Sequence, residues 1–420
     1  MTEPLSLPRL VATTREIDAV DPLLFATAED PLVWLRKGDG LAAAGPHLLH
    51  IDVGEDGRLA AIADLWRAIA QTTDVDDAVG LPGTGLVGFG AFAFDEESAS
   101  PSTLVVPSAV VGRRGGRCWM TTIRIADRDD VPQPGPVALG PSWSATLGPG
   151  AMDPRAHEQA VTEALAAIER GEAGKVVIAR DITGTIPADA DLRRLVSALA
   201  TDYPDTWAFA VDGIIGASPE TLVTVREGAV TARVLAGTRP RGANASEDGS
   251  VPGELQASGK DREEHRFAVE SVLDALRPHT SALRAADEPF TLELPNLWHL
   301  ATDVSGELSD GASALDLVRA LHPTAAVAGT PTDRAIELIR RIEPFDRGRY
   351  AGPVGWIDGD GDGEWGIALR CAQFGPASTD SDGTRVVTAH AGGGIVPGSA
   401  PEAELTETRV KFRPIVDALA

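Results

Sequence analysis

Lysine and cysteine are scarce in this chain, and long apolar runs are absent. Only four of the 420 residues are lysine, so arginine supplies nearly all of the positive charge. Two cysteines, Cys118 and Cys371, are too few for a disulfide scaffold or a cysteine-ligated zinc site. No stretch approaches the roughly 18 apolar residues of a membrane-spanning helix. The N-terminal segment has no basic stretch followed by an apolar run, so we expect no signal peptide and a cytoplasmic location.

Positive charge is also outweighed by negative charge. The chain has 37 lysines and arginines against 62 aspartates and glutamates, which gives a formal net charge of −25. Such a chain repels nucleic acid and anionic membrane surfaces, so we expect neither as a partner. An anionic substrate would need a local positive site or a metal ion. With 43% apolar and 24% charged residues, the composition predicts a soluble globular protein with a sizeable core.

Residues 1–150 show less regular patterns than the rest of the chain. Alternating and β-branched residues predict strands at 86–95 and 102–126. A short helix is expected at 63–73. The stretch 127–143, rich in Pro, Gly and Asp, predicts a loop or a subdomain seam.

The patterns sharpen from residue 152. An Asp-Pro start and a glycine stop at Gly171 or Gly174 predict a helix. Strand-like runs follow, then a long helix beginning at KDREEH, a further strand-rich tract, and a last helix from Pro401. Strand runs followed by single long helices predict an α+β layered fold with antiparallel sheets, not alternating βαβ units.

Three of the four lysines lie in dense polar motifs. Lys175 opens GKVVIARD, Lys260 lies in SGKDREEH, and Lys411 closes PEAELTETRVK. A buried ammonium group can lose its proton near neutral pH, whereas a guanidinium effectively never does. The placement therefore points to lysine chemistry, although a lysine at a strand start is also a common solvated edge charge.

Two predicted helices each carry two carboxylates in line with their apolar stripe. Asp261 and Glu264 lie three residues apart, and Glu404, Glu407 and Lys411 follow at steps of three and four. Helix capping would explain Asp261, and a solvated Glu–Lys pair would explain the second set. Two such helices together favour Mg²⁺, which takes carboxylate oxygens, keeps water and bridges an anionic substrate.

A glycine run and one further glutamate complete the candidate site. The run AHAGGGIVPGSAPE has neither the P-loop nor the dinucleotide pattern. It is typical of a tight turn, but the backbone N–H groups near Gly392 and Gly393 could hold a carboxylate. Glu220 lies in GASPETLV, where SPE is also a common turn. A buried Lys175 and a buried Glu220 facing one substrate would form a base and an acid poised near neutrality.

Ten motifs in residues 155–420 resemble those of the chorismate-utilising enzymes, in the same order and spacing. They are GKVVIARD, SPETLV, LAGTRPRG, GKDREEH, LWHLATDVSGEL, LHPTAAVAGTP, RGRYAGPVGWID, ALRCAQ, AGGGI and PEAELTETRVK. The family includes isochorismate, salicylate and aminodeoxychorismate synthases and anthranilate synthase component I. The resemblance implies two stacked antiparallel sheets flanked by helices in one interlocked domain. Residues 1–150 would form its variable half and residues 151–420 its chorismate-binding region, in a monomer.

The resemblance also implies roles for individual residues. Lys175 matches the base that activates water for attack at C2 of chorismate, and Glu220 matches the acid that protonates the departing C4 hydroxyl. Glu264 and Glu407 match Mg²⁺ ligands, with Asp261 and Glu404 at supporting acidic positions. The positions that match substrate-binding groups are Thr238, His299, Tyr350, Arg370, Gly392, Gly393 and Lys411.

Within the family, the motifs favour an Mg²⁺-dependent isochorismate synthase whose product enters menaquinone or siderophore biosynthesis. Lys175 favours the water-using branch, and Ala236 stands where one type of aminodeoxychorismate synthase carries lysine. The tryptophan-sensing motif of anthranilate synthases is missing. The segments LHPTAAVAGTP and EWGIALRCAQ look more like isochorismate than salicylate synthases. Salicylate synthase, anthranilate synthase component I and a non-catalytic chorismate-binding paralogue remain the alternatives.

Overall fold

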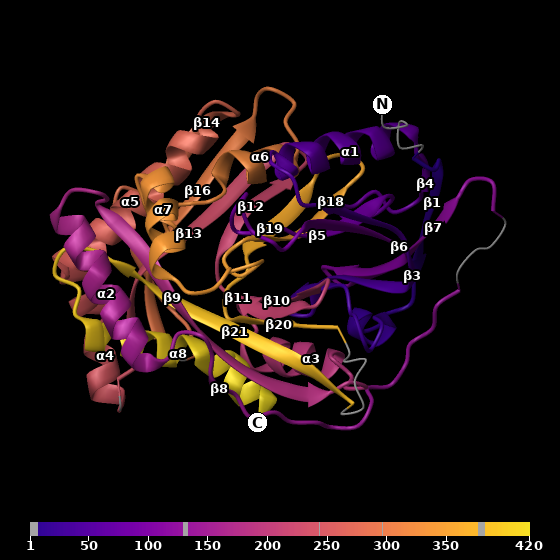
Figure 1. Cartoon of the computed structure of the whole chain (residues 1–420). Helices are drawn as coiled ribbons and strands as arrows, with labels where there is room; N and C mark the ends of the chain where they lie inside the picture. The colour runs from indigo at the N-terminus through magenta and orange to yellow at the C-terminus, as the bar shows by residue number, and fades with distance from the viewer. Residues whose placement is uncertain (1–6, 129–132, 243, 296, 377–382) are drawn as a thin grey trace.

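Helices and mainly antiparallel strands build the molecule in layers, as the sequence predicts (Figure 1). The structure, a computed structural model, describes residues 7–128, 133–242, 244–295, 297–376 and 383–420. Across these ranges, 21 strands join in one hydrogen-bonded network, and β1 (Leu10–Ile17) with β4 (Asp74–Asp77) forms a parallel pair. No helix in the described ranges combines the length and apolarity needed to cross a membrane.

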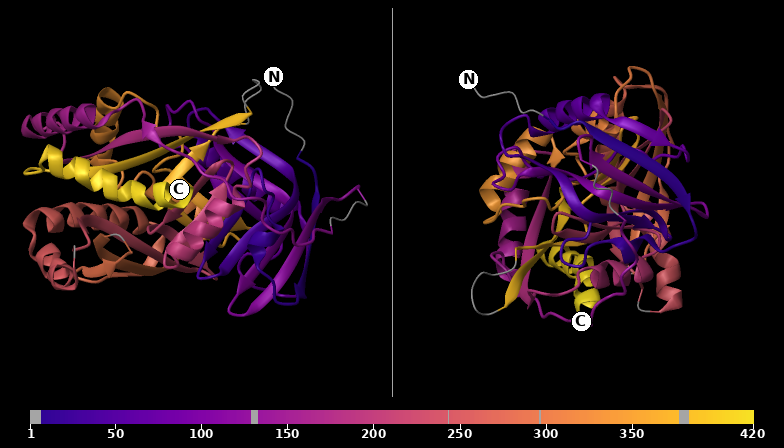
Figure 2. Two further views of the ribbon diagram at one scale, coloured as in Figure 1. Left: turned by 90° about the horizontal axis from the view of Figure 1, so that it is seen from below. Right: turned by 90° about the vertical axis from the view of Figure 1, so that its right-hand side faces the viewer.

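Two long strand pairs form the part of the fold that surrounds the site. Strand β9 (Lys175–Pro187) pairs with β21 (Thr384–Ile395), and helices α2 (Pro154–Glu169) and α8 (Pro401–Leu419) pack against them. Strand β13 (Ala229–Pro240) pairs with β16 (Leu297–Leu308) and is covered by α5 (Gly259–Leu276). Figure 2 (left) shows α8 beside α5, so the two acidic helices face each other.

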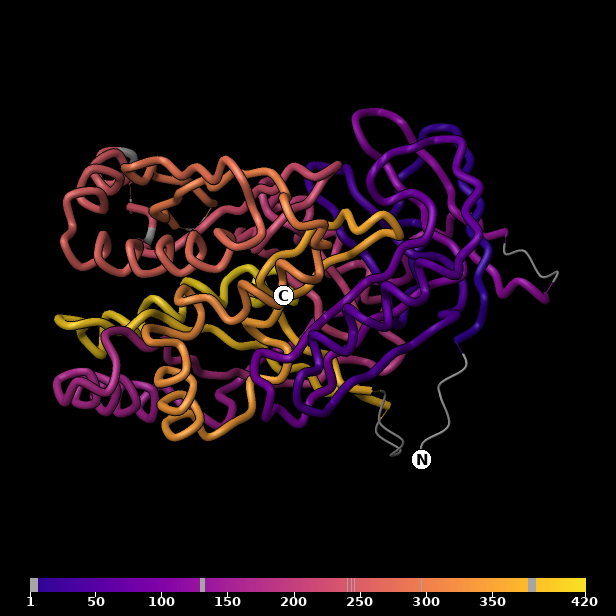
Figure 3. Tube along the Cα trace, turned by 90° about the horizontal axis from the view of Figure 1, so that it is seen from above, coloured from indigo at the N-terminus to yellow at the C-terminus, as the bar shows by residue number. Residues whose placement is uncertain are grey.

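The N-terminal residues gather at the opposite end of the molecule from α2, α5 and α8 (Figure 3). Their strands pair directly with later ones: β2 (Val33–Arg36) with β10 (Trp207–Val211), and β5 (Val87–Ala91) with β18 (Pro353–Asp358). The division of the chain at residue 150 stays a prediction.

Local sequence signals set the predicted helix starts. The Asp153 carboxylate accepts a hydrogen bond from the N–H of Ala156, and Pro154 occupies the first turn of α2. The helix ends before Gly171, whose φ of +76° suits glycine. Ser258 caps α5 by accepting from the N–H of Asp261, and α8 begins at Pro401 as predicted.

The N-terminal predictions are right in type but not in extent. The helix expected at 63–73 is longer, α1 (Arg58–Thr72). The single strand expected at 102–126 is a hairpin of β6 (Ser102–Arg114) and β7 (Arg117–Ile125), because Gly115 and Gly116 turn the chain at positive φ. Of the loop predicted at 127–143, residues 129–132 lie outside the described residues, and the rest has no regular structure.

The remaining elements complete the layers. The helices are η1 (Pro22–Phe25), α3 (Arg193–Asp202), α4 (Ala245–Ala257), α6 (Ala314–Leu321) and α7 (Thr332–Ile342). The strands are β3 (Asp39–Val53), β8 (Gly148–Pro149), β11 (Ile214–Ser218), β12 (Thr221–Arg226), β14 (Thr280–Ala285), β15 (Phe290–Glu293), β17 (Gly329–Thr330), β19 (Gly363–Ile367) and β20 (Cys371–Phe374).

Candidate active site

A narrow cavity of about 50 Å³ lies where the two strand pairs and the two acidic helices meet. Val177 of β9, Leu235 of β13 and Ala326 are among the apolar residues of its wall. Nine of the predicted site residues line it: Glu220, Thr238, Glu264, His299, Tyr350, Arg370, Gly392, Gly393 and Lys411. The other four, Lys175, Asp261, Glu404 and Glu407, are not among its lining residues.

The three consecutive glycines lie inside β21, so the prediction of a tight turn is wrong. A Cβ added at Gly394 would sit 2.3 Å from Glu264 Oε1, and one at Gly393 would sit 3.0 Å from Glu404 Oε2 and 3.3 Å from Glu407 Oε1. Only glycine therefore lets carboxylates of α5 and α8 approach this backbone so closely.

Each of the three lysines in polar motifs pairs with one of three glutamates. Lys175 Nζ lies 3.3 Å from Glu264 Oε1, and Lys411 Nζ lies 2.5 Å from Glu407 Oε1. The third pair joins the two helices, because Lys260 Nζ lies 2.7 Å from Glu404 Oε1. The glutamate charges are therefore balanced inside the protein. The sequence did not lead us to predict Lys260 as a site residue, although it is one of the three lysines that lie in polar motifs.

The carboxylate oxygens that do not pair with a lysine are suited to a divalent cation. Glu404 is 2% exposed, and its Oε2 has no hydrogen-bond partner in the described residues. Burial and the neighbouring Glu407 raise the pKa of Glu404, and burial raises the pKa of Asp261. A raised pKa means that burial disfavours the charged form of these carboxylates, which a bound cation would stabilise. An oxygen-only donor set of this kind suits Mg²⁺.

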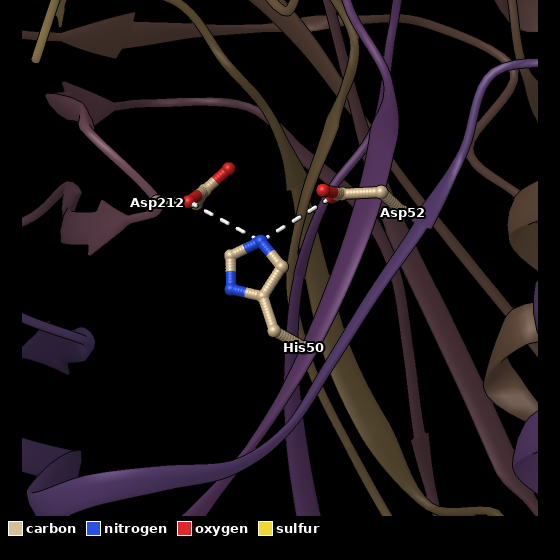
Figure 4. A group of neighbouring side chains, drawn as sticks. All are labelled: His50, Asp52 and Asp212. Atoms are coloured by element: carbon tan, nitrogen blue, oxygen red, sulfur yellow. Dashed lines mark ion pairs between the residues drawn. The ribbon is translucent and has the colours of Figure 1, made fainter.

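A more compact group of possible ligands, from β3 and from the turn between β10 and β11, lies elsewhere (Figure 4). His50, Asp52 and Asp212 place ligand atoms within 4.8 Å of one another, which Glu264, Glu404 and Glu407 do not. The Asp52 carboxylate already accepts from Thr103 Oγ1 at 2.5 Å, and Asp212 pairs with Arg349. Ordinary ion pairing to His50 accounts for this group.

Lys175 is fully buried at the start of β9. Its ammonium group makes no hydrogen bond to the described residues, although it forms the ion pair with Glu264. Its Cε would lie 2.8 Å from a Cβ at Gly394. The lysine thus stands directly beside the glycine strand, next to a residue that lines the cavity.

Glu220 lies between β11 and β12, at the end of a short loop. Its backbone N–H donates to Ser218 Oγ, and Ser218 Oγ donates to the carbonyl of Ile367, which fixes the loop. Burial raises the pKa of Glu220 to about 8, against the opposing effect of Lys175, Arg370 and Lys411. The side chain is therefore largely a neutral acid at pH 7.

A hydrogen-bonded chain orders three of the predicted substrate-binding residues. Arg370 donates to His299 Nε2 at 3.3 Å, so His299 carries its proton on Nδ1 and donates it to Thr238 Oγ1 at 2.9 Å. Burial and the charge of Arg370 hold the pKa of His299 well below its usual range. Arg370 thus presents a fixed cation to the cavity.

A buried pair behind the cavity was not found from the sequence. Arg347 donates to Glu343 Oε1 at 2.6 Å and to the carbonyls of Val327 and Val177, which line the cavity. The motif RGRYAGPVGWID contained Arg347, but the pairing depends on tertiary contacts. His265 is also structural, since its ring bonds to the Ala236 carbonyl and to Thr302 Oγ1.

The chain is similar to proteins of known family. Residues 141–420 match a family model described as chorismate binding enzyme. Isochorismate synthase DhbC of Bacillus subtilis is 39% identical over 279 residues, covering 64% of this chain and 68% of that protein. The salicylate biosynthesis isochorismate synthase of Pseudomonas aeruginosa is 31% identical over 99% of this chain and 91% of its own length. The crystal structure of DhbC from Bacillus anthracis has a TM-score of 0.76 at 30% identity, covering 94% of this chain and 98% of that one.

Proposed function

We propose, because the chain belongs to the chorismate binding enzyme family, that it is an isochorismate synthase that isomerises chorismate to isochorismate. One observation carries the proposal: a single cavity brings together the cations Arg370 and Lys411 and the neutral acid Glu220. Lys175 lies behind the cavity wall, where it pairs with the lining residue Glu264.

The two cations suit a substrate with two carboxylates. Arg370 is held by His299, and Lys411 Nζ is fixed by the Gly392 carbonyl at 2.7 Å and by Glu407. Both positions are therefore preorganised, which favours tight binding. Tyr350 adds a neutral hydroxyl, because burial raises its pKa. These residues overcome the repulsion that a net charge of −25 exerts on a dianion.

The reaction needs one base and one acid. Lys175 acts as the base in its uncharged amine form: water loses a proton to this amine as the water oxygen forms a bond to C2, the ring double bonds shift, and the bond from C4 to its hydroxyl breaks. Glu220 donates a proton to that leaving oxygen, which departs as water. Because Glu220 is protonated at pH 7, it is ready to act as the acid.

Mg²⁺ is part of the proposal. Glu264 and Glu407 would hold it, with Asp261 and Glu404 supporting, and the Glu404 oxygen that lacks a partner supports this assignment. A bound Mg²⁺ would neutralise a substrate carboxylate. Lys175, Lys260 and Lys411 would then give up part of their pairing with the glutamates.

The cavity must widen to admit a substrate. A volume of about 50 Å³ is well below the roughly 300 Å³ at which ligand pockets begin. We therefore expect side chains of the cavity wall to reorient when the substrate binds.

Chromatography of the products tests the function. The protein is incubated with chorismate and Mg²⁺, with and without ammonia, and isochorismate, salicylate and anthranilate are quantified. Isochorismate as the product supports the proposal. Salicylate would establish the alternative in which pyruvate is also eliminated, and anthranilate would establish the amine-transferring branch. Binding of chorismate by titration calorimetry without any product would establish a non-catalytic paralogue. Monomeric state, cytoplasmic location and entry of the product into menaquinone or siderophore biosynthesis stay predictions.

A further inference from the structure

Strand β9, which begins at Lys175, is only partly paired along one of its edges in the described residues. On this edge β17 pairs with β9 only as far as Val176, and β8 pairs with it only from Ile182 onward. The Val177 carbonyl and the Ala179 N–H lie between these two pairings. Buried backbone polar groups are rarely left without a partner, so other groups must bond to them.

A buried ion pair takes the place of the missing strand. Arg347 donates to the Val177 carbonyl at 2.9 Å, and Glu343 Oε1 accepts from the Ala179 N–H at 2.8 Å. Two hydrogen bonds of 2.6 and 2.8 Å join the guanidinium to the carboxylate, and both side chains are almost fully buried. The pair therefore supplies one donor and one acceptor to β9, as a neighbouring strand would.

Other contacts fix the ion pair itself. Arg347 also donates to the carbonyl of Val327 at 3.0 Å, and its guanidinium lies 4.4 Å from the centre of the Phe94 ring. Glu343 is the residue at which α7 ends. A buried ion pair is often no more stabilising than well-packed apolar residues of the same size, so these specific bonds need a further explanation.

The position of the Lys175 amine depends on the backbone of β9. Its Nζ makes no hydrogen bond to the described residues, and its ion pair with Glu264 is 3.3 Å long. Because side chains alternate along a strand, Lys175 projects from the same face as Val177, which lines the cavity. The bond from Arg347 thus holds the strand two residues from the lysine and on the face that meets a substrate.

We propose that Arg347, together with Glu343, is a positioning residue for the reaction: the pair holds β9 so that Lys175 faces the substrate. Neither Arg347 nor Glu343 is among the lining residues of the cavity, so both act through the strand. Misplacement of a reacting group by about 1 Å can lower a rate about 100-fold. The inference rests on the function proposed above.

Arg347→Lys tests the proposal, because lysine keeps the positive charge beside Glu343 but lacks the planar fork of the guanidinium. We expect kcat for isochorismate formation to fall at least about tenfold. The dissociation constant of chorismate with Mg²⁺, measured by calorimetry, should change less than about threefold, since Arg370 and Lys411 are held by other contacts. An unchanged kcat, or a loss of affinity as large as the loss of kcat, would overturn the proposal.

Arg193→Lys is the matched control. Arg193 is also buried, and it bonds to Asp191 at 2.9 and 2.7 Å. It donates as well to backbone carbonyls that do not line the cavity, those of Ala26, Val137 and Ala138. Thermal unfolding should show a similar loss of stability in both variants, but Arg193→Lys should keep its kcat within about twofold. An equal fall of kcat in the two variants would mean that general loosening lowers the rate, which contradicts positioning.

Glu343→Asp is a second variant in case Arg347→Lys does not fold. The shorter carboxylate keeps its charge but cannot reach Arg347 and the Ala179 N–H together, so the same changes in kcat and affinity are expected. If neither variant folds while Arg193→Lys does, the pair serves folding alone and the proposal is wrong. Failure of the proposed function would appear separately, as absence of isochorismate from the wild-type protein.

Discussion

Lys260 Nζ lies 2.7 Å from Glu404 Oε1, and this ion pair joins the first turn of α5 to the first turn of α8. Glu404 is 2% exposed, whereas the Lys260 side chain is 33% exposed. The pair fixes the distance between the two acidic helices that flank the site. Removing its cation would leave a buried carboxylate without its ion-pair partner.

Lys260→Gln should destabilise the fold. Breaking a buried pair costs about 3–5 kcal/mol, and water screening of the part-exposed lysine reduces this to about 1–2 kcal/mol. Urea unfolding at pH 7 measures the free energy of unfolding. Lys37→Gln is the matched control, because its pair with Asp205 is exposed on both sides and should contribute little. Equal effects of the two substitutions would contradict the structural role of Lys260.

Lys175→Met should abolish turnover but largely spare chorismate binding. The substitution removes the proposed base and keeps the volume of the fully buried side chain. Loss of a general base lowers kcat by about 10²- to 10⁴-fold. Stopped assays give kcat, and calorimetry gives the affinity for chorismate.

Lys175→Arg distinguishes proton transfer by Lys175 from the effect of its positive charge. Arginine keeps a cation beside Glu264 but cannot release a proton. If the role of Lys175 is proton transfer, this variant is as inactive as Lys175→Met. Substantial activity in Lys175→Arg would show that only the charge is needed.

Glu220→Gln should lower kcat by about 10²- to 10⁴-fold, because an amide cannot donate the proton. In the wild type, the rate should fall as the pH rises through about 8, where Glu220 loses its proton. The residual rate of Glu220→Gln should not show this decrease near pH 8. A pH–rate profile from 6 to 9.5 is the measurement, and a wild-type rate that is constant across pH 8 would reject Glu220 as the acid.

The same group makes stability depend on pH. The folded-state pKa of Glu220 is raised from the ordinary 4.5 to about 8. Its contribution to stability is therefore fully present below about pH 4.5 and is lost as the pH rises through about 8. Urea unfolding at pH 6 and at pH 8.5 should show a smaller decrease in Glu220→Gln than in the wild type. A decrease of equal size in both proteins would contradict the raised pKa.

Gly394→Ala should disrupt the site. The added Cβ would lie 2.3 Å from Glu264 Oε1 and 2.8 Å from Lys175 Cε, so both side chains must move. We expect kcat to fall at least about tenfold, since displacement of catalytic groups by about 1 Å is costly. Gly253→Ala in α4 is the control, because no atom lies within 4 Å of its added Cβ and alanine favours helices. Full activity of Gly394→Ala would show that the close approach is not required.

Glu407→Gln should weaken Mg²⁺ binding by about 10- to 100-fold. Calorimetric titration of Mg²⁺ measures this without turnover. Lys260→Gln should bind Mg²⁺ at least as tightly as the wild type, because it frees the Glu404 carboxylate. An unchanged Mg²⁺ affinity in Glu407→Gln would reject that residue as a ligand.

Helix positions and the acidic faces could be predicted because they depend on local sequence. Asp153 and Pro154 cap α2, and Pro401 starts α8, each through contacts within one turn. The three-residue spacing of Asp261 and Glu264 placed both carboxylates on one side of α5. Prediction failed at residues 102–126, where Gly115 and Gly116 interrupt an otherwise continuous strand pattern. The glycine run was also misassigned. No local sequence feature distinguishes a glycine-rich turn from a strand whose glycines let side chains approach its backbone closely.

The sequence by itself determined the family motifs, the residue types available for chemistry, and the helices that carry them. Only the tertiary structure decided which lysine pairs with which glutamate, since Lys260 and Glu404 are 144 positions apart. It also decided the raised pKa of Glu220. The reason is physical: the energy of a charge depends on its burial and on its neighbours, and both are set by segments that meet only in the folded chain.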